Sequence, residues 1–166
     1  RNLGYEICKL RYRAAVVHTY AGCHIRHIKS RVKHVIPHSL TGNVVLWCGG
    51  NNCSSQDAET VTEEYKELIE EVKVTAPASK ITIISVPPRR HSELENYRIR
   101  QVNNNLHYLC AHDENLNLID DVPTDYDLHF KSDCTHLNKR GTVYMANVVL
   151  RSLRKGFLVR RSRINL

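Results

Sequence analysis

Apolar residues recur along this chain with two spacings, one typical of amphipathic helices and the other of buried strands. Where they return every three or four residues, as over 57–74, one side of a helix is apolar and the other is charged. This spacing predicts helices over 2–13, 24–35, 57–74, 93–111 and 138–154. Short runs rich in apolar and β-branched residues predict strands over 14–20, 43–48, 80–86 and 115–119.

The predicted helices and strands alternate, which is the order of a parallel sheet with helices on both faces. We therefore predict an α/β fold of three layers, α/β/α, with the parallel sheet in the middle. A length of 166 residues suits one domain, expected over 1–155 and followed by a basic tail over 156–166. Such a domain usually opens with a strand, whereas this sequence opens in a predicted helix. We expect the first strand to be missing from the sequence.

The overall composition is that of an ordinary globular protein. Hydrophobic residues make up 42% and charged residues 25%, which excludes wholesale disorder. No apolar run approaches the ~20 residues of a membrane-spanning helix. Six cysteines are too few for a disulfide scaffold of this length, so we expect reduced thiols in an intracellular protein, cytoplasmic or nuclear.

Charge is distributed unevenly along the chain. Residues 1–40 hold eight basic and one acidic residue, and residues 151–166 hold six basic and no acidic residues. The middle, 41–150, holds ten basic and sixteen acidic residues. Basic ends suit an anionic partner such as nucleic acid, although a solvated tail and a solvated helix face would give the same count.

One candidate for chemistry is Asp133, which stands three residues before His136 in the loop that precedes the last helix. A carboxylate in this position can hold an imidazole in one tautomer and stabilise its cation, as in the orienting half of a nucleophilic triad. The alternative is that Asp133 only caps the helix that begins near Asn138.

Two further candidates follow predicted strands. Gly49-Gly50-Asn51-Asn52 comes directly after an apolar run, and Gly22 follows the segment 14–20. The carboxyl ends of parallel strands are where ligands bind in such folds. The amide of Asn51 and the backbone N–H of Gly22 are donors that can stabilise an oxyanion. A plain turn and a simple strand-to-helix bend are the alternatives.

The order and spacing of these residues, with His136-Leu137-Asn138-x-x-Gly141 as the most specific stretch, resemble the SGNH (GDSL-like) hydrolase superfamily. The likeness is closest to the esterase-like domains of LINE-type retrotransposons and spans residues 1 to about 153. It implies a flavodoxin-like SGNH fold and hydrolysis of a carboxyl (acyl or acetyl) ester of a small molecule or lipid. It implies His136 as general base, Asp133 as its orienting partner, and Asn51 and Gly22 as the oxyanion hole, with no cofactor and no metal.

The sequence departs from the family in two places. Residue 52 is Asn where the family usually has Asp. The Gly-Asp-Ser block that carries the nucleophile is absent, and Arg1-Asn2-Leu3-Gly4 resembles the helix that follows that block. We therefore expect the nucleophilic serine upstream of Arg1 and no activity from these 166 residues alone. The alternative is a catalytically inactive module that binds RNA through its basic N- and C-terminal segments.

Other residues near the predicted site loops are weaker candidates. Cysteines and serines there could act as nucleophiles beside His136, namely Cys23, Cys53, Cys134, Ser54 and Ser55. No pair of His or Cys residues has a recognised zinc spacing. Arg89 and Arg90, after a predicted strand, could attract an anionic ester or a phosphate backbone, or could lie in a solvated loop.

Overall fold

The computed structural model describes residue 6 and residues 15–90 and 92–161, with side chains described as far as 154. The chain divides into two compact units, one formed by residues 20–122 and the other by residues 123–166 together with 1–19. The predicted helix over 2–13 lies outside the described residues, except for Glu6, which is helical.

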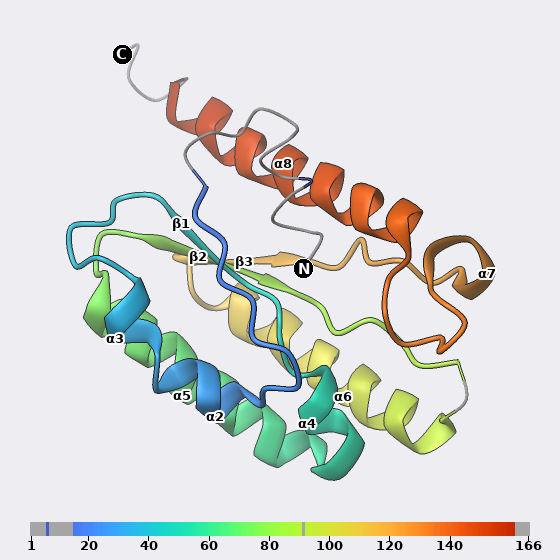
Figure 1. Ribbon diagram of the computed structural model, residues 1–166. Helices are drawn as coiled ribbons and strands as arrows, with labels where there is room; N and C mark the ends of the chain where they lie inside the picture. The colour runs from blue at the N-terminus through green and yellow to red at the C-terminus, as the bar shows by residue number, and fades with distance from the viewer. Residues whose placement is uncertain (1–5, 7–14, 91, 162–166) are drawn as a thin grey trace. The chain divides into compact units, whose positions relative to one another are not determined.

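The unit of residues 20–122 is built on a parallel sheet of three strands, β1 (Asn43–Leu46), β2 (Lys80–Ile84) and β3 (Leu116–Ile119), in that spatial order (Figure 1). Val44 is aligned with Ile81, and Ile81 with Leu116. Strand β2 is central and nearly all its side chains are buried, as the continuous apolar run predicts. Three of the four predicted strands and their parallel arrangement are confirmed.

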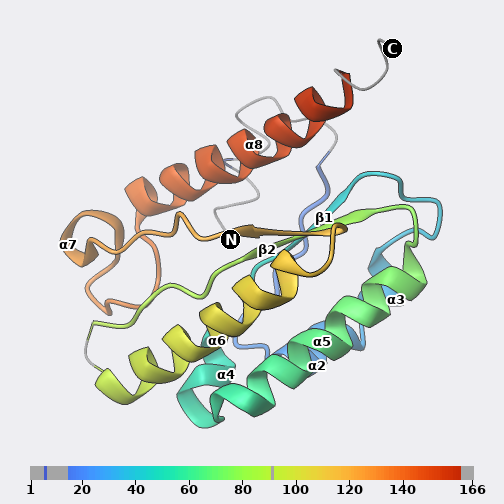
Figure 2. The same ribbon diagram turned by 180° about the vertical axis from the view of Figure 1, so that it is seen from behind.

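Five helices belong to the same unit: α2 (Ile25–Lys29), α3 (Val32–Val35), α4 (Gly50–Ser55), α5 (Ala58–Thr75) and α6 (Glu93–Ala111). Figures 1 and 2 show them on one side of the sheet, with α2 and α6 alongside α5. Tyr65 and Leu68 of α5 and Leu106 of α6 are fully buried. Full burial of a large apolar side chain stabilises a fold by about 1.5–3 kcal/mol.

The two long helices begin at side-chain caps. Asp57 accepts a hydrogen bond from the backbone N–H of Thr60 at 2.8 Å, and Ser92 accepts one from Glu95 N–H at 3.2 Å. An N-cap of this kind satisfies a backbone donor that has no partner within the helix. Both predicted helices, 57–74 and 93–111, are therefore confirmed almost to the residue.

The predicted strand over 14–20 is wrong in its described part. Residues 15–20 form no regular secondary structure, and Val16 is 82% exposed. β-Branched residues favour a strand only where a partner strand and burial are available. The predicted helix over 24–35 is interrupted, because Arg31 N–H bonds to Ile28 O at 2.9 Å and tightens the chain where α2 ends.

The predicted turn at Gly49–Asn52 is instead the start of α4. Gly49 has φ +90° and precedes the helix. A Cβ atom at this position would lie 2.7 Å from the Tyr65 hydroxyl oxygen, so only glycine fits. That hydroxyl donates to Cys48 O at 2.7 Å.

In the other unit, the described residues 123–161 form the helices α7 (Tyr126–His129) and α8 (Lys139–Arg161). Helix α7 lies within the loop predicted over 120–136, and α8 continues beyond the predicted end at 154. Phe130 and Leu137 form an isolated antiparallel bridge between the two helices in the sequence. In the part of the chain described by the structure, no helix is long and apolar enough to cross a membrane.

Candidate active site

Asp133 and His136 contact each other as their spacing predicts. Asp133 Oδ2 lies 3.0 Å from His136 Nδ1, and Asp133 Oδ1 accepts the backbone N–H groups of Thr135 and His136 at 2.9 and 2.8 Å. With Nδ1 facing the carboxylate, Nε2 is the ring nitrogen available for proton transfer. The imidazole side chain is 73% exposed.

These hydrogen bonds hold the Asp133 carboxyl in its charged form. The N–H groups of His136 and Thr135, followed by the His136 ring, lower the pKa of Asp133 to about 2. The carboxylate is therefore ionised throughout the neutral range, where it can stabilise an imidazolium.

The loop that carries the pair is closed by its own backbone. Lys131 N–H bonds to His136 O at 2.8 Å, and Cys134 N–H bonds to Lys131 O at 2.9 Å. Cys134 has φ +52°, a left-handed conformation that non-glycine residues rarely adopt. This tight turn brings the side chains of Asp133 and His136 into contact.

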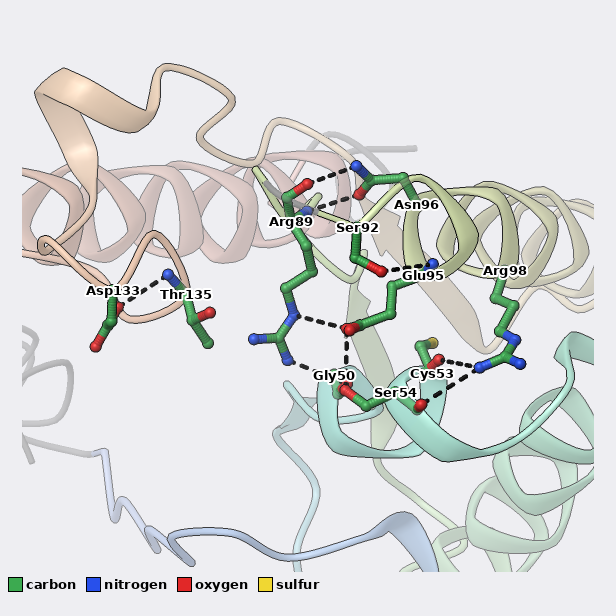
Figure 3. A network of polar contacts seen from close by, with 10 residues as sticks. All are labelled: Gly50, Cys53, Ser54, Arg89, Ser92, Glu95, Asn96, Arg98, Asp133 and Thr135. Carbon is green, nitrogen blue, oxygen red and sulfur yellow. Dashed lines mark hydrogen bonds and ion pairs between the residues drawn. The ribbon is translucent and has the colours of Figure 1, made fainter.

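Helix α8 is capped by Asn138 rather than by Asp133. Asn138 Oδ1 accepts the N–H of Gly141 at 3.0 Å, while its Nδ2 donates to Leu128 O at 2.9 Å and Phe130 O at 3.0 Å. One side chain thus fixes both the start of α8 and the end of α7. The capping alternative for Asp133 is wrong, since its side chain bonds within its own loop (Figure 3 shows the contact with Thr135).

The two predicted oxyanion residues also lie close together. Asn51 stands in α4 with an exposed side chain, and its Nδ2 donates to Cys23 O at 3.2 Å. Gly22 precedes that carbonyl and has φ +70°. The structure thus brings together Asn51 with the Gly22–Cys23 segment and Asp133 with His136, one pair in each compact unit.

Asn52 is wholly buried and ties α4 to the start of α2. Its Oδ1 accepts Ile25 N–H at 3.1 Å, and its Nδ2 donates to Gln56 Oε1 at 2.6 Å and to Glu64 Oε2 at 2.9 Å. At position 52, where the resemblance predicts Asp, the chain thus has an Asn whose side-chain donors and acceptor all have hydrogen-bond partners.

Arg89 and Arg98 bind backbone carbonyl groups of α4. Figure 3 shows Arg89 in contact with α4 and α6: its Nη2 donates to Gly50 O of α4 at 3.1 Å, and its Nε pairs with Glu95 Oε2 of α6 at 3.6 Å. Arg98 Nη1 donates to Cys53 O and Ser54 O at 3.2 and 3.3 Å. Arg89 therefore holds in place the helix that carries Asn51. The sequence did not predict this contact; the attraction of an anionic ester or a phosphate backbone stays a prediction.

Burial disfavours the thiolate at three of the five cysteines that the structure describes. It raises the pKa of Cys48 to about 12 and those of Cys53 and Cys110 to about 11. A thiol reacts as its thiolate, so Cys53 is a poor rival for the nucleophile. No group of three or more His, Cys, Asp or Glu side chains in the described part of the chain is arranged to hold a metal ion.

Comparison by sequence finds no matching family model and no matching curated protein. Solved structures do match. A family 3 carbohydrate esterase of Clostridium thermocellum superposes with a TM-score of 0.68 and 16% identity, covering 92% of this chain and 87% of its own. A protein of the lipolytic G-D-S-L family from Veillonella parvula gives 0.71 and 20%, covering 89% and 85%.

The chain has the SGNH hydrolase fold. A GDSL-like lipase of Bacteroides thetaiotaomicron matches as well, with a TM-score of 0.60, 13% identity and coverage of 81% of this chain and 73% of its own. At these identities the likeness establishes the α/β fold that the sequence predicts.

Sequence reasoning missed the residues that hold the site loops in place, chiefly Gln56, Glu64 and the carbonyl-binding role of Arg89. Glu64 is one of several acidic residues on a charged helix, and nothing in its local sequence separates it from its neighbours. The capping role of Asn138 could have been predicted, because asparagine is a preferred N-cap residue and Asn138 stands where the predicted last helix begins.

Proposed function

We propose that this chain is the larger part of an SGNH-type serine esterase domain that hydrolyses carboxyl esters, either acyl or acetyl, of a small molecule or lipid. Its nucleophilic serine is the one that the resemblance places before Arg1. His136 acts as general base, Asp133 orients it, and Asn51 and Gly22 bind the oxyanion. A relationship to the esterase-like domains of LINE-type retrotransposons belongs to the same proposal.

The observation that carries the proposal is the Asp133–His136 contact at 3.0 Å, with the carboxylate ionised and the ring exposed. The serine hydroxyl would attack the ester carbonyl carbon and pass its proton to His136 Nε2. The imidazolium would return that proton to the departing alkoxide and leave an acyl-enzyme. Water would then attack the acyl carbonyl carbon and pass one proton to Nε2. The bond from that carbon to the serine oxygen would break, and the serine oxygen would take the proton back from Nε2 as the acid is released.

Asn51 suits the oxyanion role because of how its amide is held. Nδ2 carries two hydrogens, and one of them bonds to Cys23 O. The second hydrogen remains for an oxyanion, while the first fixes the orientation of the amide. A donor that is oriented in advance stabilises the developing charge without reorganising during the reaction.

The test is turnover of p-nitrophenyl acetate by the full-length protein and by its His136→Ala variant. We expect kcat to fall by about 10²–10⁴, the usual contribution of a general base. The matched control is His107→Ala, an exposed histidine on α6 whose loss should leave turnover unchanged. Equal turnover in wild type and His136→Ala would contradict the proposal.

The nucleophile has a separate test. A fluorophosphonate reacts covalently with activated serines, and peptide mass spectrometry locates the labelled residue. We expect the label on a serine that precedes Arg1 in the full-length protein. Label on Ser54 or Ser55 would overturn this placement while leaving the esterase activity itself intact.

RNA binding is a second candidate function, favoured by the six basic and no acidic residues of 151–166 and the basic segment 1–40. Affinity for a single-stranded RNA should fall steeply with salt, with a slope of about −0.7 per phosphate contact. Neutralising the basic residues of 151–166 should flatten that slope. A slope that does not change would contradict binding through this end, and RNA binding without ester turnover would favour this candidate over the esterase.

A further inference from the structure

Three polar side chains, those of Asn52, Gln56 and Glu64, form a hydrogen-bonded group between α4, α5 and the start of α2. We call it the amide–carboxylate group. Besides the contacts of Asn52 given above, Gln56 Nε2 donates to Glu64 Oε1 at 2.7 Å. Glu64 Oε2 also accepts the backbone N–H of Arg26 at 3.2 Å. The group therefore holds two successive backbone N–H groups, those of Ile25 and Arg26.

The direction of each hydrogen bond follows from the groups that can only donate or only accept. A backbone N–H can only donate and an ionised carboxylate can only accept, so Asn52 must turn its oxygen to Ile25 and its nitrogen to Glu64. Both hydrogens of Asn52 Nδ2 are then used, one by Gln56 and one by Glu64. An aspartate at this position would have no hydrogen to donate and would set a second negative charge against Glu64.

We propose that the amide–carboxylate group positions the oxyanion hole, and that asparagine occupies position 52 because Glu64 requires a neutral donor there. This inference rests on the proposed esterase function and assigns positioning residues to it. The group holds Ile25 and Arg26, two and three residues after Cys23, whose carbonyl accepts the Asn51 amide. A shift of this segment would therefore move Gly22 and the amide of Asn51 together.

The place of the group in the fold supports this assignment. Asn52 directly follows Asn51 in α4 and is 0% exposed, as is Ile25, to which it bonds. Buried polar groups that are fully satisfied hold their neighbours rigidly, while an unsatisfied one is costly. The surface pair Lys29–Glu67, at 2.8 Å, also joins α2 to α5 but lies outside the group.

The experiment measures kcat and KM for p-nitrophenyl acetate in the full-length protein and in three variants: Asn52→Asp, Glu64→Gln, and the two combined. We expect Asn52→Asp to lower kcat about tenfold or more with KM little changed, because the oxyanion forms only after binding. In the combined variant one negative charge remains, and the amide introduced at position 64 can donate to the carboxylate introduced at position 52. The backbone N–H of Arg26 loses Glu64 Oε2 as its acceptor, but Arg26 is exposed and its N–H can bond to water instead. The kcat of the combined variant should therefore return to within about threefold of wild type.

Two matched controls accompany these variants. Glu67→Gln removes a carboxylate that joins the same two helices at the surface, and Asn104→Asp makes the same change at an exposed asparagine of α6. Neither should alter kcat. If the combined variant is as impaired as Asn52→Asp, or if either control lowers kcat as much as Asn52→Asp does, the inference is overturned.

Amide hydrogen exchange of Ile25 gives a readout that needs no esterase activity. Exchange should be faster in Asn52→Asp and slow again in the combined variant. If Asn52→Asp fails to fold, the combined variant decides. A combined variant that folds supports the match between the side chains at positions 52 and 64, and one that also fails to fold overturns that match. Restored protection in a protein that never hydrolyses an ester would mean that the proposed function has failed while the matched contact stands.

Discussion

The two carboxylate oxygens of Asp133 have different partners, and this division explains why the side chain is held so firmly in an exposed loop. Oδ1 accepts two backbone N–H groups, and Oδ2 faces the ring of His136. The sequence predicts this pair because all its partners lie within three residues. It gives no such signal for Glu64, whose partners come from two other segments of the chain.

The first prediction concerns the titration of Asp133. Its carboxyl should titrate at about pH 2 in the folded protein, because three hydrogen bonds favour the charged form. Since the pKa is lowered on folding, the interaction is complete above the unfolded value of ~3.9 and is lost as the pH falls through about 2. Carbon-13 NMR of the carboxyl, with the urea-unfolded protein as reference, measures both midpoints. A folded midpoint near 4 would contradict it.

Among the helices, length decided which could be predicted from sequence. Helices α5 and α6 have 18 and 19 residues, enough turns for the apolar spacing to be unmistakable. Helices α4 and α7 have six and four residues and were predicted as turn and loop. Residues 15–20 show the reverse error, because their β-branched content predicts a strand where the described segment has none.

The second prediction concerns the junction of α7 and α8. Gly141 lies in the first turn of α8, where alanine normally stabilises a helix by about 1 kcal/mol. Here a Cβ atom would overlap the carbonyl oxygen of His129, which also accepts Asn138 N–H at 2.9 Å. We expect Gly141→Ala to destabilise the protein by about 1–3 kcal/mol instead.

Urea unfolding measures this change in the free energy of unfolding. The control is Gly42→Ala, whose Cβ atom would meet only Leu40 Cδ1 at 3.7 Å, an ordinary contact. That variant should stay within about 0.5 kcal/mol of wild type. A stabilised Gly141→Ala protein would show that the junction is looser than its geometry indicates.

Over the whole molecule, the alternation of helices and strands was enough to predict the α/β class and the parallel sheet. The order of elements fixes which connections are possible, and few topologies satisfy it. Arrangement within the fold is different, since hydrogen bonds such as Asn52–Glu64 join residues 12 positions apart through packing that no local pattern encodes. The division into a domain over 1–155 and a tail over 156–166 stays a prediction.

The third prediction concerns thiols distributed through the unit of residues 20–122. Cys48, Cys53 and Cys110 should react with iodoacetamide at pH 8 at least about tenfold more slowly in the folded protein than in urea, because burial raises each pKa. Peptide mass spectrometry measures the rate at each site. Alkylation of Cys48 at the unfolded rate would show that its surroundings are open to water.

The pairing of Asn52 with Glu64 constrains the order in which these two positions can change during evolution. A lineage that replaces asparagine by aspartate first must pass through a state with two adjacent carboxylates. A lineage that first replaces glutamate by glutamine passes through a neutral state in which amides bond to amides. Evolution between a protein with asparagine at position 52 and glutamate at position 64 and one with aspartate and glutamine there should therefore pass through a protein with asparagine and glutamine. Ancestral sequences reconstructed between the two should carry glutamine at position 64.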